Sequence, residues 1–183
     1  MSHNYSEFKA KIKNTAEAES CLEPKSDLQE LLRYFQGTNT GAFEAKISEG
    51  ADIIRSAETV VFVGLGSSGT LARYGARYFS NLGKFSIGLE DPYYPISEIV
   101  QQKTVLIVLS VTGETKEIIK FVEKFQAGNS KILSITNQPG STISRMSDWN
   151  ISYYTGIRLV NGGYNATSQV PVLFLMEALA RRI

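Results

Sequence analysis

The sequence predicts an α/β protein: a doubly wound, three-layer sandwich with a central five-stranded parallel sheet, preceded by N-terminal helices. From Thr59 onward, short apolar runs alternate with helical patterns, which is the order expected for strand–helix–strand units with right-handed crossovers. The run TVLIVLS over residues 104–110 is apolar on successive residues. Such a run is typical of a parallel strand that is covered on both faces.

The predicted strands are short apolar runs, and the segments between them have the spacing of amphipathic helices. The strands are expected over Val60–Val63, Phe85–Leu89, Thr104–Leu109, Ile132–Ile135 and Asn150–Tyr153. The helices are expected over Thr70–Leu82, Thr115–Ala127 and Ser141–Met146, near Ser97–Gln101, and from Ser168 to the C-terminus.

The first 58 residues contain no convincing strand and are predicted to be helical. Helices are expected over Tyr5–Thr15, from Asp27 toward Gly37, and over Gly41–Ala57. Pro24 breaks the chain between the first two, and Asp27 is placed to cap the second. We therefore divide the chain into a helical arm, residues 1–40, and an α/β domain, residues 41–183.

Composition excludes several classes of protein. The 183 residues suffice for about one compact domain. With a formal net charge of +1, the chain as a whole has no strong positive potential that would attract nucleic acid or an anionic membrane. The chain has one cysteine, Cys21, and one histidine, His3, which predicts no disulfide and no metal site built on such residues. With no apolar run of membrane-spanning length, we expect a cytosolic protein that needs no metal or cofactor.

Two loops combine glycines with hydroxyl side chains. The first, GLGSSGT at 64–70, follows the first predicted strand, and the second, SVTGET at 110–115, follows the third. Glycines let the backbone approach a ligand closely, and each loop leads into a helix whose first amides lack intrahelical partners. Two such helix ends converging in space form a site for a phosphate monoester.

Two other interpretations of these loops remain open. Gly64, Gly66 and Gly69 satisfy the G-x-G-x-x-G pattern after a strand, and Glu90 follows about twenty residues later, as in a dinucleotide-binding fold. The hydroxyls are also common helix-capping residues. A dinucleotide site does not require the second hydroxyl loop, so the two loops together favour a phosphate site.

The pair VFVGLGSSG and LSVTGETKE resembles the sugar isomerase (SIS) domain family, whose second loop has the signature S-x-S-G-x-T. The resemblance covers residues from about 41 to 183 and includes the ITN of residues 135–137. It implies a flavodoxin-like sheet and binding of a phosphosugar. The implied phosphate-binding residues all lie in the two loops. They are Gly66, Ser67, Ser68, Ser110, Thr112, Gly113 and Thr115. Thr112 stands where the family usually has serine, and its extra methyl group stiffens the rotamer.

Residues near the sugar are implied less directly. The segment GIRLVNGGYNATS at 156–168 joins the last predicted strand to the last helix, and in SIS-like domains this region lies near the sugar or a partner subunit. Ser168 and Gln169 are therefore candidates for sugar contact, together with Glu90 and Asn137. A plain surface loop that ends in a helix cap explains the segment equally well.

An isomerase would need a base to move a proton between two carbons. The family's isomerases commonly use Glu and His, but this chain offers no histidine after His3. The available carboxylates, Glu90, Asp91, Glu114 and Glu177, are equally explained as partners of helix dipoles or solvated side chains. We therefore assign no catalytic residue, and a stand-alone phosphosugar aldose–ketose isomerase remains the alternative.

The N-terminal YSEFK at residues 5–9 is similar to the end of the helix-turn-helix domain of RpiR-type transcriptional regulators. This resemblance implies the effector-binding part of such a regulator, whose DNA-binding part lies outside this chain. A homodimer is also expected, because SIS domains pair through helices such as the one predicted over Thr70–Leu82. The two DNA-binding domains of such a dimer would match an operator with two-fold symmetry.

Overall fold

The computed structural model describes residues 24–95, 103–160 and 162–183. The helices expected over Tyr5–Thr15 and near Ser97–Gln101, and the YSEFK segment, lie outside these residues. A search of the described helices finds none that is long and apolar enough to cross a membrane.

The predicted parallel sheet is confirmed. Its strands are β1 (Thr59–Val63), β2 (Ser86–Leu89), β3 (Thr104–Ser110), β4 (Lys131–Thr136) and β5 (Trp149–Ser152). They lie in the order β2-β1-β3-β4-β5, and every neighbouring pair is parallel. All seven residues of β3 are buried, because this central strand is covered on both faces.

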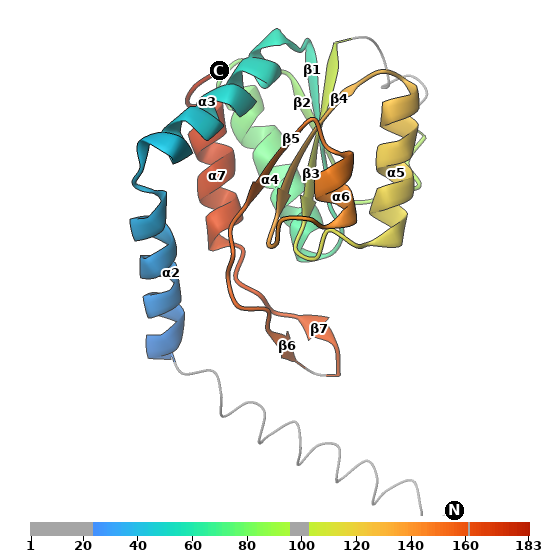
Figure 1. The fold of residues 1–183 in the computed structure, drawn as a ribbon. Coiled ribbons are helices and arrows are strands. Elements are labelled where there is room, and N and C mark those ends of the chain that lie inside the picture. The colour runs from blue at the N-terminus through green and yellow to red at the C-terminus, as the bar shows by residue number, and fades with distance from the viewer. Residues whose placement is uncertain (1–23, 96–102, 161) are drawn as a thin grey trace, which may run out of the picture. The chain divides into compact units, whose positions relative to one another are not determined.

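Helices cover both faces of the sheet (Figure 1). The helices are α2 (Pro24–Thr38), α3 (Gly41–Ser56), α4 (Ser67–Asn81), α5 (Lys116–Ala127), α6 (Thr142–Met146) and α7 (Val170–Ala180). In Figure 1, α5 and α6 lie on one face, and α3, α4 and α7 lie on the other. The sheet and these five helices form the three layers that the sequence predicts.

Apolar side chains pack between the sheet and the helices on each of its two faces. Phe121 and Phe125 of α5 pack with Val61 and Val108 of the sheet, and all four side chains are fully buried. On the other face the helices approach so closely that glycine is needed. A Cβ atom at Gly75 would lie 2.8 Å from the Met176 sulfur and from the Phe62 ring.

The described chain divides into two compact units, which we treat separately. The larger comprises residues 38–154 and 169–183, and the smaller comprises residues 155–168 together with the chain up to Gly37. The larger unit contains the whole parallel sheet. The boundary predicted at residue 40 stays a prediction.

The smaller unit contains two features that differ from the prediction. Helix α2 begins at Pro24, where a break was expected, because the fixed φ of proline suits the first turn of a helix. Asp27 lies in that first turn and forms an ion pair with Arg158. The segment expected to be a loop contains an antiparallel hairpin, β6 (Leu159–Val160) and β7 (Tyr164–Asn165).

Replacing Gly50 by Ala should destabilise the protein. A Cβ atom there would lie 2.8 Å from the Trp149 ring and 3.0 Å from Leu179, and overpacking of this kind costs about 1–3 kcal/mol. The matched control is Gly41→Ala at the start of the same helix, where a Cβ atom would meet nothing within 4 Å. Urea unfolding measures both, and equal midpoints would contradict this packing.

Candidate functional site

The two glycine-and-hydroxyl loops follow the neighbouring strands β1 and β3, between which the order of the strands in the sheet reverses. The chain passes from β1 outward to β2 and then returns to β3 on the other side of β1. The helices that follow β1 and β3, α4 and α5, therefore lie on opposite faces of the sheet (Figure 1). In an open α/β sheet, ligands bind outside the carboxyl ends of the strands at such a point.

The first loop makes a tight turn into α4. A Cβ atom at Gly64 would lie 2.5 Å from the Ser68 carbonyl oxygen, and Gly66 has a φ of +57°, so both positions favour glycine. Because of this turn, α4 begins at Ser67, three residues before the predicted start. Ser67 and Ser68 are thus first-turn residues, Ser67 exposed and Ser68 only 6% exposed.

The second loop turns its hydroxyl oxygens toward its own backbone. The Gly113 amide donates to Ser110 Oγ at 3.1 Å, and the Glu114 amide donates to Thr112 Oγ1 at 3.2 Å. A hydroxyl that accepts in this way keeps its proton for another acceptor. Thr115 is the N-cap of α5 and makes no side-chain capping bond. The loop therefore presents hydroxyl donors at the start of a helix.

Gln169 joins the site from a distant part of the sequence. Ser68 Oγ donates to Gln169 Oε1 at 2.9 Å, and Gln169 Nε2 donates to Ser67 Oγ at 2.6 Å. Gln169 is one of the residues predicted to contact the sugar, and in the structure its side chain lies against the first loop. A hollow of about 380 Å³ adjoins these residues. It is lined by Ser67, Thr70, Leu71, Gln169, Val170 and Leu173.

The other sugar candidates have different surroundings. Glu90 lies against the first loop, because a Cβ atom at Gly69 would be 3.1 Å from Glu90 Cγ. Its carboxylate is 3.4 Å from Arg73. Asn137 is fully buried, and its backbone amide donates to the Val111 carbonyl at 3.0 Å. Ser168 belongs to the smaller unit.

Sequence reasoning named Asn137 at the start of the loop after β4 but missed Ser141 and Thr142, which lie against the second loop. Gly113 has a φ of +66°, and a Cβ atom there would lie 2.1 Å from Ser141 Oγ. The Glu114 carboxylate accepts from the Thr142 hydroxyl at 2.7 Å and from the Thr142 amide at 2.8 Å. The serine N-cap of the predicted short helix was the available signal, since Ser141 caps α6 through the Ser144 amide.

Hydrogen bonds lower the pKa of two of the candidate carboxylates, Glu114 and Glu177. The Thr142 hydroxyl and amide lower the pKa of Glu114 by donating hydrogen bonds to its carboxylate. The Tyr74 hydroxyl and Arg181 lower the pKa of Glu177 in the same way, and the same hydrogen bond raises the pKa of Tyr74 to about 12. A carboxylate with a lowered pKa is a weaker proton acceptor.

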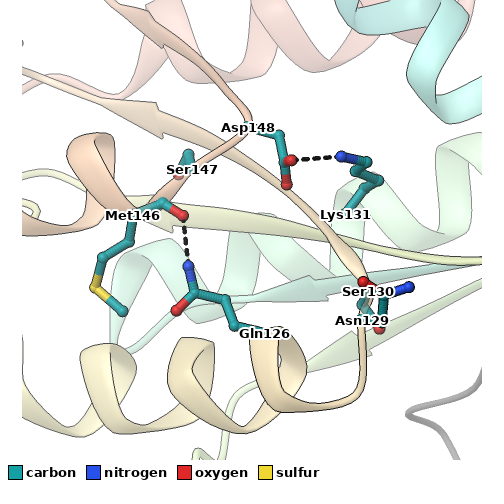
Figure 2. A pocket seen from close by; sticks show the side chains of 7 residues that line it. All are labelled: Gln126, Asn129, Ser130, Lys131, Met146, Ser147 and Asp148. Carbon is teal, nitrogen blue, oxygen red and sulfur yellow. Dashed lines mark hydrogen bonds and ion pairs between the residues drawn. The ribbon is translucent and has the colours of Figure 1, made fainter.

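A second hollow, of about 250 Å³, lies near the start of β4 (Figure 2). Two pairs of its polar groups interact: Lys131 Nζ is 2.6 Å from Asp148 Oδ1, and Gln126 Nε2 donates to the Met146 carbonyl at 2.8 Å. The Ser130 hydroxyl is buried and has no hydrogen-bond partner among the described residues. None of its lining residues belongs to the predicted phosphate or sugar set. The first loop, the second loop and Gln169 therefore define the candidate site.

The arrangement is that of a doubly wound α/β protein with two glycine-and-hydroxyl loops at the carboxyl edge of its parallel sheet. The model of the SIS domain family matches residues 53–180, so the chain belongs to this family. The match places both glycine-and-hydroxyl loops inside a SIS domain. It favours the phosphosugar interpretation of the glycine pattern over the dinucleotide one.

Two relatives indicate what larger proteins contain such a domain. An uncharacterised HTH-type transcriptional regulator of Clostridium perfringens is 28% identical over 130 residues, 70% of this chain and 46% of the regulator. A glutamine–fructose-6-phosphate aminotransferase (isomerizing) of Methanocaldococcus jannaschii is 29% identical over 130 residues, 70% of this chain and 12% of that protein. The chain thus spans less than half the length of either relative.

Two solved structures share the fold. The sugar isomerase domain of an RpiR transcription factor from Sphaerobacter thermophilus has a TM-score of 0.65 at 16% identity, with 100% of this chain and 90% of that one covered. The Vibrio vulnificus NanR protein, complexed with ManNAc-6P, has a TM-score of 0.74 at 21% identity, with 91% and 64% covered. At these identities the likeness concerns the fold alone.

The hydrogen bonds of Glu114 predict a pH-dependent contribution to stability. Because the folded-state pKa lies below the usual 4.5, the contribution is present above the unfolded pKa and is lost as the pH falls through the folded one. The free energies of unfolding of the wild type and of Glu114→Gln in urea should therefore differ most near neutral pH and converge as the pH falls through the folded-state pKa of Glu114. In a Thr142→Val background, the difference in unfolding free energy between proteins with and without Glu114→Gln should be smaller, because one hydrogen bond to the carboxylate is lost. A difference that does not change with pH would contradict the lowered pKa of Glu114.

Proposed function

We propose that this chain is the phosphosugar-binding, effector-sensing SIS domain of an RpiR-type transcriptional regulator. The observation that carries the proposal is the pairing of β1 with β3, whose ends open into the two glycine-and-hydroxyl loops. The proposed phosphate contacts come from both loops. They are Gly66, Ser67, Ser68, Ser110, Thr112, Gly113 and Thr115. Gln169 and Glu90, which lie beside the first loop, would face the sugar.

Neutral donors would supply the attraction for the phosphate. The two loops contain no lysine or arginine before Lys116, so the hydroxyls and the amides at the starts of α4 and α5 carry the binding. Without a bidentate guanidinium clamp, we expect dissociation constants in the micromolar to millimolar range, about 4–8 kcal/mol. This range suits the sensing of a metabolite at cellular concentration.

A sensing role without catalysis is supported by the carboxylates. Glu114 is engaged by Thr142, and Glu177 by Tyr74 and Arg181, so neither is poised to abstract a proton. The alternative, a phosphosugar aldose–ketose isomerase, would need a different base, such as Glu90 beside the first loop. Incubating the chain with hexose and pentose phosphates in D₂O separates the two: a sensor leaves the sugar protons unexchanged, whereas exchange at C1 or C2 would establish the isomerase.

The regulator assignment is supported by the similarity to an HTH-type regulator and by the YSEFK motif at residues 5–9. In this proposal the N-terminal segment, residues 1–40, leads toward a DNA-binding part outside this chain, and the domain at 41–183 binds the effector. The regulator would work in the cytoplasm as a homodimer. Light scattering after size-exclusion chromatography tests the proposed dimer, and a monomeric mass at all protein concentrations would contradict it.

Ligand-screened melting tests the phosphosugar proposal most directly. The chain is heated with pentose and hexose phosphates, with N-acetylmannosamine 6-phosphate, and with NAD as the representative dinucleotide. A ligand at 100 times its dissociation constant stabilises the folded state by about 2.7 kcal/mol, so one sugar phosphate should raise the melting temperature by several degrees. Stabilisation by NAD alone would support the dinucleotide interpretation and overturn the proposal.

Alanine at either loop serine should weaken the binding of that sugar phosphate without unfolding the protein. Ser68→Ala and Ser110→Ala each remove one hydroxyl donor, with a cost of about 1–2 kcal/mol in binding free energy. Isothermal titration measures the loss. Ser56→Ala is the matched control, because its hydroxyl donates to the Ile53 carbonyl at an exposed helix end. Unchanged affinity in both loop variants would place the phosphate elsewhere.

A further inference from the structure

The start of helix α6 holds the second loop through its backbone and through one side chain. The Ile143 amide donates to the Gly113 carbonyl at 3.0 Å. The Glu114 carboxylate accepts from the Thr142 amide at 2.8 Å and from the Thr142 hydroxyl at 2.7 Å. All four residues belong to the larger unit, and α6 lies on the same face of the sheet as α5 (Figure 1). Three hydrogen bonds therefore join the second loop to the first turn of α6.

The backbone of the second loop is also held at the two preceding peptide units. The Asn137 amide donates to the Val111 carbonyl at 3.0 Å. The Gly113 amide donates to Ser110 Oγ at 3.1 Å. Together with the bond to the Gly113 carbonyl, these contacts fix one polar group in each of the three peptide units between Val111 and Glu114. The loop therefore has a defined conformation without a ligand.

Groups of the protein itself take up the first amides of α6. The first three of them donate to the Glu114 carboxylate, the Gly113 carbonyl and the Ser141 hydroxyl. The first amides of a helix have no intrahelical acceptor, so they favour an anionic partner. The Arg145 guanidinium donates to Thr142 Oγ1 at 3.3 Å, so a cation supports the hydroxyl that donates to the carboxylate. Glu114 is thus the anion that the start of α6 binds.

One peptide unit connects this contact to the Thr112 hydroxyl. The Gly113 carbonyl and the Glu114 amide belong to the same peptide unit, and no described peptide bond is cis, so the two groups point in opposite directions. Because the carbonyl faces the Ile143 amide, the Glu114 amide points away from α6 and donates to Thr112 Oγ1 at 3.2 Å. An oxygen that accepts in this way keeps its proton for another acceptor.

We propose that Glu114 and Thr142 are positioning residues of the phosphate site, which bind the second loop to the start of α6 so that Thr112 can donate to the phosphate. This inference rests on the proposed function and adds to it a residue outside the two loops. In this proposal neither side chain touches the phosphate. They act by ordering the loop in advance, so that the ligand does not have to order it on binding.

The charge of Glu114 by itself predicts the opposite effect on binding. A carboxylate near an anion site repels a phosphate, so the removal of its charge would tighten binding. Removal of a positioning residue weakens binding instead, because the loop must then be ordered when the phosphate binds. Ordering the backbone of one residue lowers affinity by about five- to thirtyfold. The direction of the change therefore separates the two roles.

Titration of the 183-residue chain with inorganic phosphate, followed by the NMR shifts of the amides at 64–70 and 110–116, measures this change. Glu114→Ala should bind phosphate about five- to thirtyfold more weakly than the wild type. The matched control is Glu117→Ala, which removes the same charge from an exposed position in the first turn of α5. This control should bind phosphate as tightly as the wild type or more tightly.

Two outcomes of this titration overturn different claims. If the wild type binds phosphate and Glu114→Ala binds it equally or more tightly, the positioning role is wrong and the phosphate site stands. If inorganic phosphate shifts none of the loop amides in the wild type, the phosphate site is wrong and the positioning role falls with it.

Thr142 allows a test that leaves the charge of Glu114 in place. Thr142→Val lacks the hydroxyl donor and should bind phosphate about two- to tenfold more weakly, whereas Thr142→Ser keeps the hydroxyl and should bind as the wild type does. Gly50→Ala separates binding from stability, because its packing contact is with Trp149 at the start of β5. Its unfolding midpoint should fall while its phosphate affinity stays unchanged. Equal affinity in Thr142→Val and the wild type would overturn the role of Thr142.

A double-mutant cycle tests the connection to Thr112. Thr112→Ala should weaken phosphate binding in the wild type, because it removes a hydroxyl donor. In the Glu114→Ala background the same substitution should cost at least about twofold less, because the hydroxyl is no longer positioned. Strictly additive effects of Thr112→Ala and Glu114→Ala on the binding free energy would overturn the coupling between α6 and Thr112.

Discussion

The parallel pairing of β1 with β3 is the constraint on which the site depends. Val63 lies opposite Val108, so the two strands finish nearly in step, and adjacent strands lie about 4.8 Å apart. The loops that follow must therefore start side by side, although more than forty residues separate them in the sequence. The helices after the two strands cover opposite faces, and in open α/β sheets ligands bind at such a point.

The number of hydroxyl protons that are available to an anion in the candidate site is smaller than the number of hydroxyl groups. Ser110 and Thr112 accept from backbone amides, which fixes the loop and leaves their protons free for an anion. Ser68 has already given its proton to Gln169. In the proposed site, a phosphate could therefore use the hydroxyl protons of the second loop directly, whereas it would compete with Gln169 for the proton of Ser68.

The sequence predicted the sheet well, because strands such as β3 bury every side chain and so produce an unbroken apolar run. Both loops followed from glycine and hydroxyl patterns next to those strands. Contacts between distant segments could not be predicted in the same way: nothing near Gln169 in the sequence points to Ser67, and nothing near Gly113 points to Ser141. The two-residue strands of the hairpin are too short to show alternation.

The glycine pattern of the first loop illustrates why a single motif decides little. Gly64 and Gly69 are needed because the loop and the start of α4 pass within 3 Å of positions where a Cβ atom would lie. A tight strand-to-helix turn makes this demand whether the ligand is a dinucleotide or a phosphosugar. What differs is the neighbouring strand. Here β3 ends in a second loop with its own hydroxyls and helix start, which a dinucleotide site does not require.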